Sequence, residues 1–246
     1  MPWLILLSLY IAIFSANSKA QEPPIEQLLN IEIAAYQLSS AFSAYVLFTG
    51  LPKYSEELDT IIEATSPILS SAKSVYPDIA EKWQGSLDYI ERSKELVYSP
   101  DDHRLIIGFF TYQNGLYDSI EQHKQVLAQA STNSAPHHSM EEYLYIRASF
   151  ERAIAQYIAF SASSAGFVVS DISIEDNVKA FSANIESITN KGAAYNRINT
   201  KWRFIKSNML KNPGQTSPFI TMRTAVDIRK LLEQIYTNEL MSDSDF

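Results

Sequence analysis

The sequence contains no cysteine and only seven glycines in 246 residues. The absence of cysteine excludes disulfide bonds, cysteine-based zinc sites, c-type haem attachment and thiol nucleophiles. Glycine is used at less than half of its ordinary frequency of about 7%. β-Sandwiches need glycine in their tight turns, and nucleotide-binding loops need it where the backbone approaches phosphate. These two absences therefore disfavour all-β folds and nucleotide-binding folds.

Positive charge is also scarce, because 20 lysines and arginines stand against 28 acidic residues and give a formal net charge of −8. Such a surface repels nucleic acid, so no nucleic-acid partner is expected. In contrast, 46% of the residues are hydrophobic and 12% are aromatic. The chain can therefore bury a substantial core without covalent cross-links.

The first twenty residues form a segment of their own. Residues 2–16 carry no charge and centre on the apolar run 3–14, which small and polar residues ending in Ala20 follow. This pattern predicts a signal peptide that is cleaved after Ala20, and hence a periplasmic protein. The apolar run is short for a bilayer-spanning helix, which needs roughly 20 residues. The segment before the apolar run lacks lysine and arginine, which departs from the usual signal-peptide pattern. An uncleaved N-terminal anchor is the alternative, because the apolar segment could tilt or lengthen through Ser15 and Ala16.

After this segment, apolar residues recur every three or four positions, which predicts an all-α protein. Pro, Gly and Asp clusters separate the apolar stretches at intervals of about 25 residues, as turns between helices do. The predicted helices cover approximately residues 25–48, 55–76, 77–98, 103–128, 139–166, 173–190, 193–210 and 217–239.

The two halves of the chain share a motif. Tyr76-x-x-Ile79-x-x-Lys82-Trp83 recurs as Tyr195-x-x-Ile198-x-x-Lys201-Trp202 after a shift of 119 residues, both times at the start of the third helix of a half. This repeat predicts a tandem duplication of an antiparallel four-helix module, with both tryptophans as packing residues. The predicted organisation is a signal peptide (1–20), a first module (21–128), a linker (129–138), a second module (139–241) and an acidic tail (242–246).

The first helix of the second half carries Arg147-Ala-Ser-Phe-Glu151-Arg152 followed by Ala-Ile-Ala-Gln-Tyr157. This segment resembles the arginine motif in the first helix of the PilJ-type sensory domain, the N-terminal module of type IV pilus methyl-accepting chemotaxis transducers. It keeps the second and third arginines of that motif at their spacing, whereas residues 35–45 of the first half keep only its Ala-Tyr end. The resemblance implies a periplasmic, sensor-like bundle that binds a ligand and is not an enzyme.

Arg147 is the candidate anchor for a ligand. It lies on the core stripe of its helix, so its side chain is predicted to point inward. A buried guanidinium must be paired, because burying it alone costs several kcal/mol. A small anionic ligand could supply the negative charge. Three further residues of the stripe would then line the site: Tyr143, Phe150 and Tyr157.

A structural interpretation of Arg147 stays open beside this one. The guanidinium could pair with an acid of the protein, such as Asp227 on the last helix or Glu151 nearby. Arg152 lies five residues further on, about 140° around the helix. It is therefore predicted to be a surface or interface residue.

No catalytic or metal-binding constellation is visible in the sequence. Acidic pairs at 56–57, 101–102, 141–142 and 175–176 are predicted to lie in first helical turns, where acids offset the helix dipole. His123 is predicted to be a hydrogen-bonded residue at the edge of the core. We therefore expect no enzyme, no cofactor and no bound metal. Two functions remain: a ligand-binding sensory module that acts with a membrane sensor, or a structural module that docks to an envelope protein or filament.

Overall fold

The computed structural model describes residues 24–97, 103–130, 139–163, 173–188, 192–211 and 217–243. The predicted signal peptide and linker positions 131–138 lie outside these ranges. Within them every regular element is a helix, so the predicted all-α class is confirmed. The elements are α2 (Pro24–Leu47), α3 (Pro52–Val75), α4 (Pro77–Ser93), the short 3₁₀ helix η1 (Lys94–Leu96), α5 (His103–Ala130), α6 (Ser139–Ala162), α7 (Ile174–Ile188), α8 (Ala193–Lys211) and α9 (Pro218–Asp243).

Most helix boundaries follow from local signals. α2 ends in a turn in which Thr49 and Gly50 have φ values of 53° and 67°, and the Gly50 amide donates to the Tyr45 carbonyl at 2.8 Å. At the start of α7, the Ser173 hydroxyl accepts a hydrogen bond from the Asp176 amide. None of the helices in the described ranges is long and apolar enough to cross a bilayer.

Three predicted boundaries are corrected. α3 begins at Pro52 and not near Ser55, because proline suits the first position of a helix. The acidic pair 56–57 consequently lies beyond the first turn, whereas the pairs 141–142 and 175–176 do lie in first turns. The pair 101–102 lies outside the described residues. α5 and α9 extend to Ala130 and Asp243, so the predicted linker and tail both begin inside helices.

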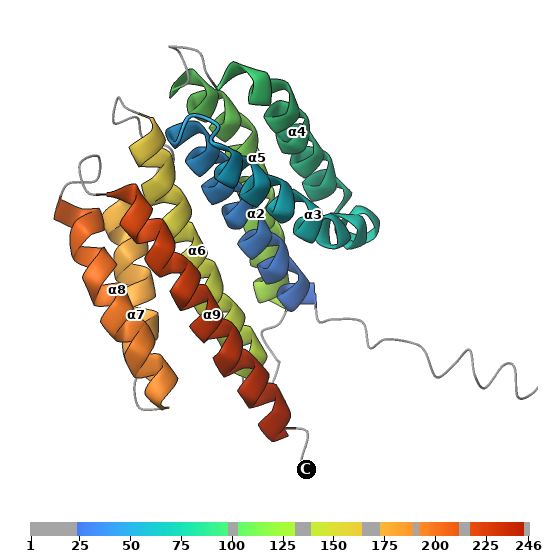
Figure 1. The fold of residues 1–246 in the computed structure, drawn as a ribbon. Helices are drawn as coiled ribbons and strands as arrows, with labels where there is room; N and C mark the ends of the chain where they lie inside the picture. The colour runs from blue at the N-terminus through green and yellow to red at the C-terminus, as the bar shows by residue number, and fades with distance from the viewer. Residues whose placement is uncertain are drawn as a thin grey trace, which may run out of the picture.

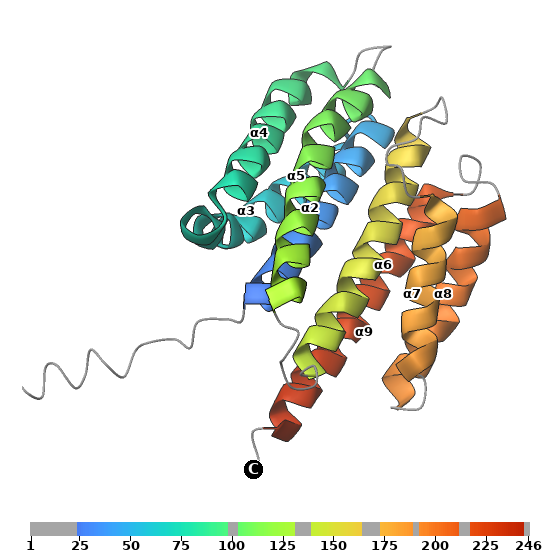
Figure 2. The ribbon, with the colours of Figure 1, turned by 180° about the vertical axis from the view of Figure 1, so that it is seen from behind.

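The eight α-helices of the described ranges fall into two sets with the same pattern of contacts. α2 and α4 each pack against both α3 and α5, and α7 and α9 each pack against both α6 and α8. Within each set, successive helices alternate in direction (Figure 1). The most extensive contact in the molecule joins α2 to α6, and these two helices run in the same direction (Figures 1 and 2).

α2 and α6 are also nearly in register. The side chain of Gln37 contacts Glu151, and that of Glu32 contacts Arg152. These pairs are 114 and 120 residues apart, close to the 119-residue shift of the repeated motif. Residues in the middle of each first helix therefore lie beside the middle of the other.

The residues of the repeated motif occupy equivalent places in α4 and α8. Ile79 and Ile198 are buried, and so are Trp83 and Trp202, which confirms that the tryptophans are packing residues. Lys82 and Lys201 each reach the fourth helix of their own set, where they contact Ser119 and Asp227.

Gly108 of α5 allows Tyr89 of α4 to approach closely. A Cβ atom at Gly108 would lie 2.2 Å from the Tyr89 hydroxyl, which donates to the Leu105 carbonyl at 3.0 Å. We expect Gly108→Ala to displace this ring and to lower the free energy of unfolding by about 1–3 kcal/mol. Urea denaturation at neutral pH measures the change.

Gly115→Ala, in the same helix, is the matched control. Its Cβ atom would meet only the Lys82 side chain at 3.9 Å. We expect it to stabilise the protein by about 0.5–1 kcal/mol, the ordinary gain of alanine over glycine in a helix. Equal effects of the two substitutions would contradict the role of Gly108.

Candidate functional site

The predicted site residues on α6 lie in the core and at its edge. Tyr143, Phe150 and Tyr157 are buried. Arg147 is partly exposed, and its Nη2 atom donates to Glu233 Oε1 of α9 at 3.5 Å. Arg147 therefore pairs with an acid of the protein, although not with either of the acids expected from the sequence.

Those two acids have other partners, so both proposed pairings of Arg147 are wrong. Asp227 accepts a hydrogen bond from Lys201 at 2.7 Å. Glu151 binds Arg229. The sequence could not distinguish Glu233 from Asp227, because both lie on α9 and only the packing of α6 against α9 decides which one reaches Arg147. A ligand-binding role for Arg147 stays a prediction.

Glu151 of α6 is fully buried and fully paired. Arg229 of α9 donates to its two oxygens from Nε, at 2.8 and 3.1 Å, and from Nη2, at 2.7 Å, while Gln37 of α2 donates to Oε1 at 3.0 Å. Burial acts to lower the pKa of Arg229, but the charge and hydrogen bonds of Glu151 outweigh it and hold that pKa above its usual range. Glu151 is thus a closed structural link between α6, α9 and α2.

Glu32 is the equivalent residue of α2, 119 positions earlier, and it is also buried. Its Oε1 atom accepts a hydrogen bond from Arg152 of α6, and its Oε2 atom accepts one from Lys124 of α5 at 3.0 Å. Glu32 and Glu151 therefore share one arrangement: a cation from the fourth helix of the same set and a donor from the first helix of the other set.

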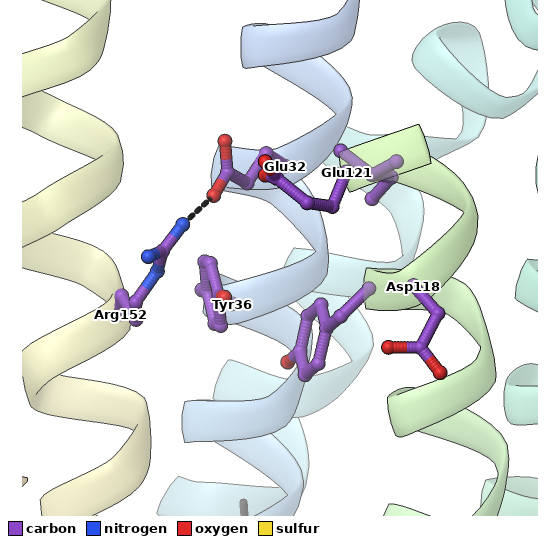
Figure 3. Close-up of a pocket in the computed structure, with 7 residues that line it drawn as sticks. Glu32, Tyr36, Asp118, Glu121 and Arg152 are labelled. Atoms are coloured by element: carbon purple, nitrogen blue, oxygen red, sulfur yellow. Dashed lines mark hydrogen bonds and ion pairs between the residues drawn. The ribbon is translucent and has the colours of Figure 1, made fainter. Parts of the chain in front are cut away.

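A pocket of about 380 Å³ opens beside Glu32, between α2, α5 and α6. Arg152 and Glu32 reach toward each other from α6 and α2, and Asp118 and Glu121 project from α5 (Figure 3). The lining residues are Glu32, Tyr36, Tyr117, Asp118, Ile120, Glu121 and Arg152. The structure thus places Arg152 at an interface inside the chain, where it lines a pocket.

Aromatic rings form part of the wall of this pocket. The rings of Tyr36 and Tyr117 stack, with centroids 4.4 Å apart and an interplanar angle of 22°. The Arg152 guanidinium lies 5.4 Å from the centroid of Tyr36. The Tyr117 hydroxyl shares a 2.6 Å hydrogen bond with the Ser39 hydroxyl. A charged group and two rings therefore form a continuous row across the junction of the two sets.

The surroundings fix the charge states of these groups. Burial raises the pKa of both tyrosines well above the usual range, and the nearby Arg152 only partly offsets it. Burial acts to lower the pKa of Arg152, but the neighbouring Tyr36 and Glu32 outweigh this effect and hold that pKa above its usual range. Burial acts to raise the pKa of Glu121, but Lys124 outweighs it and brings that pKa below its usual value. At neutral pH the tyrosines are neutral, Arg152 is a cation and Glu121 is an anion.

The internal repeat contains a signal for this site that the sequence analysis missed. When the 119-residue shift is carried into the first helices, Glu32-x-Ala-x-x-Gln37 aligns with Glu151-x-Ala-x-x-Gln156. The family resemblance instead aligned residues 35–45 with 147–157, a shift of 112, and so concealed the equivalent glutamates. The contacts between α2 and α6 favour the shift of 119.

His123 of α5 lies apart from this pocket, as expected for a residue at the edge of the core. Its Nε2 atom is 3.0 Å from Asp78 Oδ1, and its ring meets that of Tyr76 edge to face. This confirms the prediction of a hydrogen-bonded histidine. In the part of the chain that the structure describes, no group of three or more His, Asp or Glu side chains could hold a metal ion.

We expect Arg229→Met to lower the free energy of unfolding by about 3–5 kcal/mol, because it leaves the buried carboxylate of Glu151 without its guanidinium. Urea denaturation at neutral pH measures the loss. Combining it with Glu151→Gln should recover most of the loss, because no uncompensated charge then remains. Lys201→Met, which breaks an exposed ion pair, is the control and should have little effect. Equal losses in the two single variants would contradict the assigned role of Glu151.

We expect an NMR titration to find the pKa of the Glu121 carboxyl below its ordinary value, and to find it higher in Lys124→Met. Because the pKa is lowered in the folded protein, the ionised carboxylate stabilises the fold above the unfolded-state pKa. That contribution is lost as the pH falls through the folded-state pKa. Lys73→Met, which removes an exposed lysine of α3, is the control and should leave the titration unchanged.

Comparison with known proteins assigns no function to this pocket. No family model matches the chain, and no curated protein or solved structure is significantly similar to it. The function has to be inferred from the junction between the two sets of helices, from its charges, and from the pocket that opens there.

Proposed function

We propose that the protein is a non-catalytic, exported helical module that binds a small ligand at the junction of its two halves, as sensory domains do. The observation that carries this proposal is the pocket beside Glu32, in which charged and aromatic side chains of α2, α5 and α6 meet. Ligand sites are typically concave and largely preformed, with a few polar groups among apolar walls. This pocket is concave, and its lining is more polar than that: four charged residues border it together with two tyrosines and one isoleucine.

The resemblance to the PilJ-type sensory domain supports the same class of function. Two arginines of α6 carry that resemblance, Arg147 and Arg152. Arg152 lines the pocket, whereas Arg147 pairs with Glu233 on another side of α6. We therefore assign the ligand-binding part of the motif to Arg152. Export follows from the predicted signal peptide at residues 1–20.

The proposal includes a duplication of a four-helix module. Its support is the recurrence of contacts in the two sets of helices, together with the equivalent burial of Trp83 and Trp202. A ligand in the pocket would touch both modules, since Arg152 belongs to the second and Tyr36 to the first. Binding can shift an equilibrium between two arrangements only by as much as the ligand prefers one of them. A membrane sensor or another envelope protein would bind one of the two arrangements and so respond to the shift.

A non-catalytic role agrees with the chemistry of the pocket. The two tyrosines are neutral at physiological pH, because burial raises their pKa values. Arg152 and Lys124 are paired with carboxylates. These groups can hold and orient a ligand.

The test is a thermal-unfolding screen with propylammonium, propionate, nitrate and nitrite, repeated with variants that separate the two candidate sites. Asp118→Trp places a large ring at the mouth of the pocket and should preserve the fold, because Asp118 is exposed. We expect at least one probe to raise the melting temperature of the wild type, Asp118→Trp to abolish the response, and Arg147→Ala to retain it.

Two other results would redirect the assignment. A response that survives Asp118→Trp but is lost in Arg147→Ala would place the ligand at Arg147, as the sequence predicts. No response to any probe would favour the alternative function, a structural module of the envelope in which the charges at the junction serve only to join the two halves.

A further inference from the structure

We propose that the ligand of the junction pocket is a small organic cation, such as a protonated or quaternary amine. The inference rests on the proposed function and specifies the ligand class of the same site. The sequence predicts an anionic ligand at Arg147, whereas this inference predicts a cationic ligand in the pocket. The sign differs because acidic residues outnumber basic residues around the pocket.

The first argument is the balance of charge around the pocket. Three carboxylates line it, those of Glu32, Asp118 and Glu121. Two cations offset part of this negative charge. Arg152 and Lys124 both bind Glu32, and Lys124 also lies 3.3 Å from Glu121. Across the described ranges of the chain, no ion pair within 4.0 Å reaches Asp118. One negative charge is left over, so a monovalent cation would balance the site.

The second argument is the position of the acidic groups. Asp118 and Glu121 are three residues apart on α5, and residues at this spacing lie on one face of a helix. Both project from α5 beside the pocket (Figure 3). An ammonium group beside either carboxylate would donate charge-assisted hydrogen bonds to it or, if quaternary, would be held by direct Coulomb attraction. An anion in the same place would meet repulsion from both.

The third argument is the aromatic wall. Cations are attracted to the faces of tyrosine rings, and Arg152 already lies over Tyr36 in this way. The stack of Tyr36 on Tyr117 extends the aromatic surface toward α5. An alkylammonium ion combines a charge for the carboxylates with apolar groups for the rings. A small inorganic anion offers neither.

A metal ion fits this site poorly. No cluster of carboxylates and histidines in the described residues has the geometry to hold a metal. The pocket of about 380 Å³ is also far larger than a single ion requires. Its size and its rings favour an organic group.

The experiment compares two probes of matched size and opposite charge, propylammonium and propionate, with tetramethylammonium as a third probe. Isothermal titration calorimetry of the purified protein at constant ionic strength measures the affinities. We expect saturable binding of both ammonium ions and at least about tenfold weaker binding of propionate. Added salt should weaken the binding of the cations, because charge attraction contributes to it.

Variants then identify the groups responsible. Asp118→Asn and Glu121→Gln keep the shape of the side chains and remove one charge each, and each should weaken the binding of propylammonium about tenfold. Glu63→Gln, the same change at an exposed position of α3, should leave affinity unchanged.

Each contrary result has a separate meaning. Binding of propionate but not of the ammonium ions, abolished by Asp118→Trp, would overturn the cation while leaving the proposed function intact. Equal weakening by Glu63→Gln and Asp118→Asn would show a general attraction to the acidic surface and would also overturn it. If no probe of either charge binds, both the inference and the proposed function fail.

Discussion

The burial of two equivalent glutamates in the parallel α2–α6 pair is the constraint on which the rest of the structure depends. A buried carboxylate is costly unless it is paired and hydrogen-bonded. Glu32 and Glu151 both meet this need by recruiting a cation from the fourth helix of their own set, Lys124 and Arg229 respectively. Each also takes a donor from the opposite first helix. Sliding α2 along α6 would break both sets of bonds, so the two glutamates fix the register of the halves.

The two junction sites differ because their partners differ. Arg229 clamps both oxygens of Glu151 in a fork and leaves that carboxylate no accessible surface. Around Glu32, two separate cations each take one oxygen, and the site stays open on the side of α5. The ring of Tyr36 occupies a position where the other half has Ala155. Of the two buried acids, Glu151 thus serves as a closed link and Glu32 borders a pocket.

Much of the fold could be predicted from the sequence, because helical periodicity and turn residues are local signals. The presence and order of the helices, the burial of the repeated Trp83 and Trp202, and the pairing of His123 are of this kind. The site was harder to predict, because α6 contacts α2, α7 and α9 and is covered around most of its circumference. Arg147 and Arg152 therefore both meet acids on neighbouring helices. The pocket lies beside Arg152, and residues of another helix, such as Tyr117 of α5, complete its lining.

The electrostatic arrangement also suggests how occupancy of the pocket could reach the rest of the molecule. Lys124 divides its charge between Glu32 and Glu121, and Arg152 holds Glu32 from the other half. A cation beside Glu121 would compete with Lys124 for that carboxylate. Lys124 would then interact more strongly with Glu32. The balance between Lys124 and Arg152 at Glu32 would then change. Because Arg152 belongs to α6, this change would act on the contact between the two halves, where the proposed sensory function requires it.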